Sequence, residues 1–144
     1  MKFVLTSINF TGEIILEFAS HGFLTHYLNN TDMSIQALTY WFERMPVVQT
    51  DVEKLKARFK TLVINEVKLD LSFKAFWDCY SYKVGKIKKI EELWNLLPEA
   101  DKLKVFKNIK DYDYFLSFRR GQAKMYPSTY LNQRAFETEW RTLI

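Results

Sequence analysis

The sequence predicts an all-α protein built as a small helical bundle. Apolar residues recur at helical spacing along most of the chain, and only four glycines and three prolines interrupt it. The chain has 144 residues, of which 48% are hydrophobic, so it can bury a core without disulfides or metal ions. We expect a carboxy-terminal three-helix bundle with a docked tail, preceded by about three amino-terminal helices.

The first predicted helix follows a weakly alternating stretch, residues 1–10, which suits either a short strand or an arm. Thr11 is a good N-cap residue, and the residues after it are apolar nearly all round, as in a buried central helix. Asn29 and Asn30 end this helix, because asparagine tolerates the left-handed conformation.

Two further helices are expected before residue 70. Ser34 caps the first of them, and Pro46 stops it. Thr50 and Glu53 have the spacing of a capping box, and they open a helix whose apolar face continues to Val63.

The charge balance changes near residue 70, where we place a boundary between regions 1–70 and 71–144. Residues 1–72 carry seven Lys/Arg and eight Asp/Glu, a net charge of −1, whereas residues 73–144 carry fourteen and nine, a net charge of +5. This asymmetry favours a polyanion partner for the second half. The alternative is that the charge only keeps a small domain soluble.

The second half is predicted to contain helices at about 73–82, 86–97 and 99–119, with a tail at 122–144 that packs back on them. Ser72 caps the first helix, whose aromatic residues recur at positions i, i+3, i+4 and i+7. Gly85 separates the first helix from the second.

The strongest sign of function is a group of lysines at the start of the second helix. Lys86, Lys88 and Lys89 occupy its first turn, where the helix dipole disfavours positive charge. Backbone amides at a helix start can add to such charge in holding a phosphate. We therefore predict an anion site in this segment.

Ten residues are the candidates for binding nucleic acid. Lysines supply phosphate contacts, and tyrosines stack on unpaired bases. The alternative for each tyrosine is a place in the core with its hydroxyl at the rim. The candidates are Lys83, Lys86, Lys88, Lys89, Lys107 and Lys110, with Tyr82, Tyr114, Tyr126 and Tyr130.

No enzyme, cofactor or metal site is predicted. The chain has one cysteine and no zinc-binding pattern, and His21 and His26 lie five residues apart, on different faces of the predicted helix. Asp111 and Asp113 point in different directions on a helix and make a poor acid and base pair. No apolar run is long enough to span a membrane, and no signal-peptide pattern is present, so we expect a cytoplasmic protein.

Several patterns in the second half occur together in a known family. They are Phe73-x-x-Phe76-Trp77-x-x-Tyr80, Lys83-Val84-Gly85-Lys86, Trp94-x-x-Leu97, and Pro127-Ser128-Thr129-Tyr130-Leu131-Asn132 followed by Phe136-Glu137-x-Glu139. Residues 73–140 thereby resemble the C-terminal domain of DnaT-like primosomal and phage replisome-organiser proteins. The sequence departs from that pattern at Ser81, where the family has proline, and at Tyr130 and Phe136, which replace tryptophans.

The resemblance implies a replication accessory protein of a phage or mobile element that binds single-stranded DNA and assists helicase loading. The implied partners are single-stranded DNA and a replicative helicase or another replication protein. The alternative is a protein-interaction module of such a complex with little direct DNA contact. The many aromatic residues of the chain suit that alternative, because tyrosine and tryptophan are favoured at interfaces. A related alternative is self-association into a homo-oligomer through the amino-terminal helices.

Overall fold

The computed structural model describes residues 1–144 and has a mixed α/β fold, so the all-α prediction is wrong. The chain divides into two compact units, Met1–Leu69 and Asp70–Ile144. We call them the amino-terminal unit and the carboxy-terminal unit and describe each by itself.

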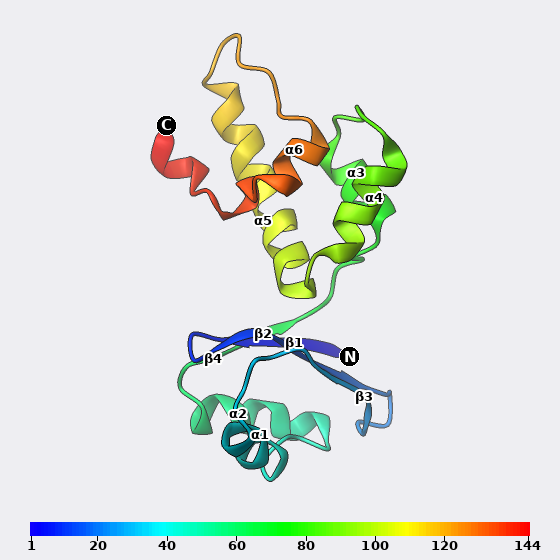
Figure 1. Cartoon of the computed structure of the whole chain (residues 1–144), viewed down its shortest axis with the longest axis vertical. Helices are drawn as coiled ribbons and strands as arrows, with labels where there is room; N and C mark the ends of the chain where they lie inside the picture. Colours follow the sequence, from blue (N-terminus) through cyan, green and yellow to red (C-terminus); the bar gives the residue numbers. More distant parts are fainter. The chain divides into compact units, whose positions relative to one another are not determined.

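The amino-terminal unit is a four-stranded antiparallel sheet with two helices on one face (Figure 1). The sheet order is β3-β2-β1-β4, so the two central strands come first in the chain. The strands are β1 (Lys2–Ser7), β2 (Phe10–Phe18), β3 (Leu24–Asn29) and β4 (Leu62–Glu66). The helices are α1 (Ile35–Phe42) and α2 (Val52–Arg58), the latter preceded by the 3-10 turn η1 (Gln49–Asp51).

The core of this unit lies between the sheet and the two helices. Leu5 of β1 and Leu16 of β2 are fully buried there, and they pack with Trp41 of α1 and Leu55 of α2. Burial of these apolar side chains is what holds the helices on the sheet.

The predicted helix from Thr11 to Asn29 does not exist, because this segment forms β2 and β3. Strand β2 is central, and its residues are buried without a break from Glu13 to Leu16. A strand buried on both faces shows no apolar and polar alternation, so its sequence cannot be told from a buried helix by periodicity. The turn at Gly22, which has a φ of +87°, separates the strands.

The remaining predictions for this unit had mixed outcomes. Ser34 does cap α1, since its hydroxyl accepts a hydrogen bond from the Ala37 N–H at 3.2 Å. The capping box at Thr50 is wrong, because Asp51 occupies the cap position of α2 and makes no side-chain cap bond. Helix α2 also ends at Arg58 and does not continue to Val63, which belongs to β4.

The two histidines do not lie on a helix. His21 is in the turn after β2, and His26 is on β3, and both side chains are exposed. The prediction that they lie on different faces of one helix is therefore wrong.

The carboxy-terminal unit contains only helices and 3-10 turns (Figure 1). They are α3 (Phe73–Tyr80), α4 (Ile87–Leu96), α5 (Glu99–Ser117), α6 (Pro127–Asn132), η2 (Ala135–Glu137) and η3 (Trp140–Leu143). The three predicted helices are confirmed, and Ser72 caps α3 by accepting a hydrogen bond from the Ala75 N–H at 3.2 Å.

Helix α5 is the centre of this unit, because α3, η2 and η3 all pack against it. Phe76 of α3 stacks on Trp94 of α4 with ring centroids 4.5 Å apart. Trp140 of η3 lies 4.6 Å from the Tyr112 ring of α5, and it is 7% exposed. The expectation of a docked tail is therefore confirmed.

No helix in either unit combines the length and the apolar character that crossing a membrane requires.

Candidate nucleic-acid interface

Helix α4 begins with uncompensated positive charge. Lys86 is its N-cap residue and makes no side-chain cap bond, and the first turn contains no acidic residue. Lys86, Lys88 and Lys89 are all exposed. The three lysines predicted at a helix start are thus at the surface, where an anion can reach them.

Two of these lysines line a small pocket between α4 and α6. The pocket has a volume of about 180 Å³, and its wall is formed by Lys86, Lys89, Ile90, Ser128 and Asn132. Two ammonium groups, a hydroxyl and a carboxamide provide hydrogen-bond donors of the kind that bind phosphate oxygens. Lys88 does not line the pocket.

A pair of tyrosines is formed by the same two segments of the chain. The rings of Tyr82, in the α3–α4 loop, and Tyr126, just before α6, stack with centroids 6.0 Å apart and an interplanar angle of 12°. Tyr126 is 53% exposed, and Tyr82 is partly buried. An exposed ring face of this kind can stack on an unpaired base.

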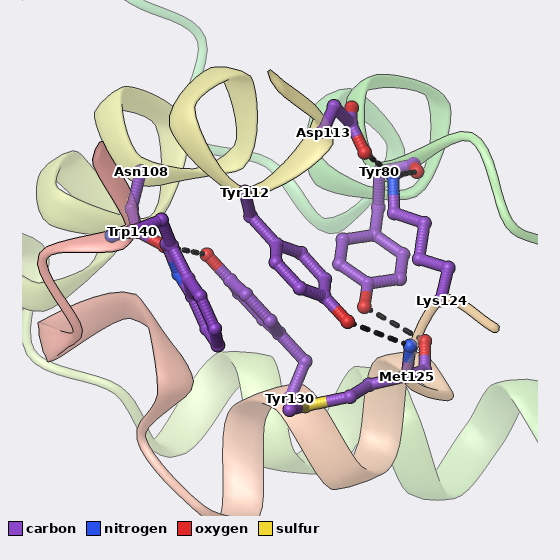
Figure 2. Close-up of polar contacts among 8 residues, drawn as sticks. All are labelled: Tyr80, Asn108, Tyr112, Asp113, Lys124, Met125, Tyr130 and Trp140. Atoms are coloured by element: carbon purple, nitrogen blue, oxygen red, sulfur yellow. Dashed lines mark hydrogen bonds and ion pairs between the residues drawn. The ribbon is translucent and has the colours of Figure 1, made fainter. Parts of the chain in front are cut away.

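Partly buried hydrogen bonds fix the segment that carries Tyr126 (Figure 2). The Tyr80 hydroxyl donates to the Met125 carbonyl at 2.8 Å, and the Met125 N–H donates to the Tyr112 hydroxyl at 2.9 Å. The Lys124 ammonium donates to the Tyr80 carbonyl at 2.7 Å and pairs with Asp113. The chain just before Tyr126 is therefore held on both sides by core residues.

Tyr130 belongs to the core and not to the surface. It is 0% exposed, and its hydroxyl donates to the Asn108 carboxamide oxygen at 2.7 Å (Figure 2). The Trp140 indole N–H donates to the same oxygen at 2.9 Å. Because its ring is enclosed, Tyr130 cannot stack on a base in this structure, contrary to the prediction.

Burial raises the pKa of Tyr80 and of Tyr130 far above the usual value near 10, and the neighbouring Tyr112 adds to the effect. Both hydroxyls therefore remain protonated at neutral pH, as their role as donors requires.

A second group of candidates lies on α5. Lys107, Lys110 and Tyr114 recur at i, i+3 and i+7 and are all exposed, so they share one face of the helix. The Tyr114 ring packs on Phe118 at 5.0 Å and beneath the Arg141 guanidinium at 4.4 Å. No described contact joins this group to the pocket.

Lys83 is engaged elsewhere. Its ammonium donates to the Asp78 carboxylate at 2.7 Å, and this hydrogen bond lowers the pKa of Asp78. Both side chains are exposed, so the pair is worth little and can be broken by a competing phosphate.

Sequence reasoning did not single out four residues on which the site depends. Ser128 and Asn132 line the pocket, and Lys124 and Asn108 anchor the elements behind it. Asn108 carried a usable signal, because asparagine inside a helix is unfavourable unless its side chain has a specific partner. Ser128 and Asn132 lie in the Pro127–Asn132 pattern of the sequence, but their position beside Lys86 and Lys89 depends on the fold, as does the role of Lys124.

The backbone conformation of Ser81 explains why this position has no proline, unlike the DnaT-like pattern. It adopts the left-handed conformation, with φ 61° and ψ 11°. Proline is locked near a φ of −65°, so it cannot occupy this position of the turn. The structure thus shows that the loop before Lys83 is built differently from one that contains proline.

The carboxy-terminal unit is therefore a helical module with a small basic pocket and a stacked tyrosine pair of which Tyr126 is exposed. Residues 68–134 match the family model described as the Legionella vir region protein LvrA C-terminal domain. This similarity replaces the resemblance to DnaT-like replisome organisers, which is wrong. No curated protein and no solved structure matches the chain.

Proposed function

We propose that the carboxy-terminal unit binds single-stranded nucleic acid at the junction of α4 and α6. The observation that carries the proposal is the pocket that Lys86 and Lys89 share with Ser128 and Asn132, in the same two segments that present Tyr82 and Tyr126. A phosphate enters the pocket, and an adjacent base stacks on the tyrosine pair. The proposal includes no catalysis and no cofactor.

The chemistry of the junction suits a single strand better than a duplex. A base can reach the face of Tyr126 only when it is unstacked from its neighbours, and such stacking contributes about 1–3 kcal/mol for each base. The lysines supply a charge term that does not depend on sequence. The arrangement therefore favours weak sequence preference.

The test is titration of the full chain with single-stranded and double-stranded oligonucleotides at two salt concentrations. For single strands the logarithm of the affinity falls with the logarithm of the salt concentration by about 0.7 for each phosphate contacted. Reversing the charge of Lys86 and Lys89 together should lower affinity at least about tenfold at low salt and reduce this slope by about 1.4.

The matched control is the double charge reversal of Lys107 and Lys110, which changes the net charge equally but lies on α5. It should weaken binding less than the Lys86 and Lys89 variant. Equal losses would show that only the net charge matters and that the pocket is not the site.

The aromatic pair has its own control. Tyr126→Ala should weaken binding to single strands about fivefold or more, whereas Tyr114→Ala should have little effect. No binding to any oligonucleotide at low salt would overturn the proposal and favour the protein-interaction alternative. A role in replication depended on the DnaT-like resemblance and is not proposed.

A further inference from the structure

The amino-terminal unit contains a cavity that the proposed function does not use. Its volume is about 470 Å³, which is in the range of small-molecule sites. The cavity is formed by the end of β1, the starts of β2 and β4, helix α1 and the residue after α2. Its lining includes Asn9, Asp32, Tyr40, Trp41, Phe59 and Thr61.

Aromatic rings set at steep angles form its apolar wall. The Tyr40 and Phe59 rings meet at 87° with centroids 5.7 Å apart, and Trp41 and Phe59 meet at 55° with centroids 6.1 Å apart. These contacts join the three rings into one continuous apolar wall of the cavity.

The Tyr40 ring is held in place although the side chain is 49% exposed. The Arg44 guanidinium lies 3.6 Å from its centroid and donates to the Tyr40 carbonyl at 3.2 Å. Arg44 is itself paired with Glu43 at 3.0 Å, which offsets its charge. The aromatic wall is therefore preorganised.

Asp32 is the only charged residue that lines the cavity. One of its carboxylate oxygens accepts a hydrogen bond from the Thr11 N–H at 2.7 Å, and the other accepts none. Elsewhere in the lining, the Asn9 side-chain amide donates to the Thr61 hydroxyl at 2.9 Å. The cavity thus combines an aromatic wall with one exposed carboxylate, and the cation at this wall is Arg44, which lies on one face of the Tyr40 ring.

We propose that this cavity binds a quaternary or N-methylated ammonium group. Such a cation is compact, it is attracted to the faces of aromatic rings, and its methyl groups suit an apolar wall. The free oxygen of Asp32 supplies the counter-charge. Choline and N-trimethyl-lysine carry this chemistry as a free metabolite and as a modified side chain, respectively.

The test compares two ligands of nearly the same shape. Choline is titrated into the full chain and followed by the indole NMR signal of Trp41, and 3,3-dimethylbutan-1-ol, its uncharged counterpart, is titrated in parallel. Choline should bind about tenfold more tightly. Equal affinity for the two, or no saturable binding of either up to about 10 mM, would overturn the proposal.

Two variants locate the effect, and a third serves as the control. Asp32→Asn keeps the acceptor for Thr11 and removes the charge, and Tyr40→Leu removes the ring, so each should weaken choline binding about fivefold or more. Glu17→Gln removes a negative charge from strand β2, outside the cavity lining, and should leave binding unchanged. Folding of each variant is confirmed by the dispersion of its NMR spectrum.

Parallel titration with N-trimethyl-lysine distinguishes the two sources. Tighter binding of this ligand than of choline points to a modified side chain, and the reverse points to a free metabolite. Unchanged choline affinity in both the Asp32 and Tyr40 variants would place any binding elsewhere and refute the assignment of this cavity.

Discussion

Asn108 shows how one side chain can hold three parts of a small domain together. Its carboxamide oxygen accepts from Tyr130 of α6 and Trp140 of η3, and its amide donates to the Thr138 carbonyl at 2.8 Å. Both acceptor positions of the carboxamide oxygen are thereby used. A hydrophobic replacement would leave two buried donors without partners.

We predict that Asn108→Ala destabilises the protein by about 2–5 kcal/mol, because an unsatisfied buried donor costs about 1–3 kcal/mol. Urea unfolding followed by far-UV circular dichroism measures the change. Asn95→Ala, at an exposed position of α4, is the control and should change stability by less than about 0.5 kcal/mol. Similar losses for the two variants would contradict the role assigned to Asn108.

The buried tyrosines make the folded state less stable at high pH. Tyr80 and Tyr130 have raised pKa values in the folded state, whereas in the unfolded chain they ionise near pH 10. The unfolded state therefore loses protons first, and the stability that these groups contribute is complete below pH 10 and falls as the pH rises above it.

We predict that tyrosinate absorbance at 295 nm rises in two steps. The exposed tyrosines ionise near pH 10, and Tyr80 and Tyr130 ionise only as the carboxy-terminal unit unfolds. Circular dichroism recorded in parallel should lose helical signal with the second step. A single smooth titration with the helical signal retained would show that the two hydroxyls are accessible.

At the scale of elements, the helices could be predicted from sequence and the sheet could not. Helices α1 and α3 have polar caps at Ser34 and Ser72 followed by apolar residues at helical spacing, and both signals are local. Strand β2 gives no such signal, because its neighbours β1 and β3 bury both of its edges and its apolar run is continuous. The pairing of β1 with β4, which lies more than fifty residues further along the chain, is a non-local property.

Part of the candidate site could likewise be predicted from the sequence, and part could not. Lys86 and Lys89 were predicted because the charge of a helix start is a local matter. Their association with Ser128 and Asn132 depends on the packing of α6 against α4, which no local pattern encodes. Tyr130 was misassigned because an aromatic residue in a short helix has the same local pattern whether it is buried or exposed.

Strand β2 depends on glycine at one position. Gly12 has a φ of +91°, and a Cβ atom there would lie 2.0 Å from the Asn30 carbonyl oxygen. We predict that Gly12→Ala destabilises the amino-terminal unit by about 3 kcal/mol or more, through backbone strain together with the clash. Gly121→Ala is the control, because Gly121 also has a positive φ, 82°, but a Cβ there meets nothing within 4 Å. Its cost should be the strain alone, about 1 kcal/mol, and equal losses in thermal unfolding would contradict the prediction.

At the scale of the whole molecule, each unit has its own core and its own charge. The buried clusters share no residue, and each lies entirely within one unit. Residues 1–69 carry seven Lys/Arg and seven Asp/Glu, whereas residues 70–144 carry fourteen and ten. The net positive charge of the chain therefore belongs to the unit that holds the basic pocket.

This separation predicts that residues 70–144 fold alone and retain nucleic-acid binding. Every contact in the proposed interface, and every residue of the core behind it, lies in this range. The isolated fragment should show helical circular dichroism and cooperative unfolding. It should bind a single-stranded oligonucleotide within about threefold of the full chain and with the same dependence on salt, because the same phosphates are contacted. A fragment that folds but does not bind, beside a full chain that does, would place essential contacts in the amino-terminal unit.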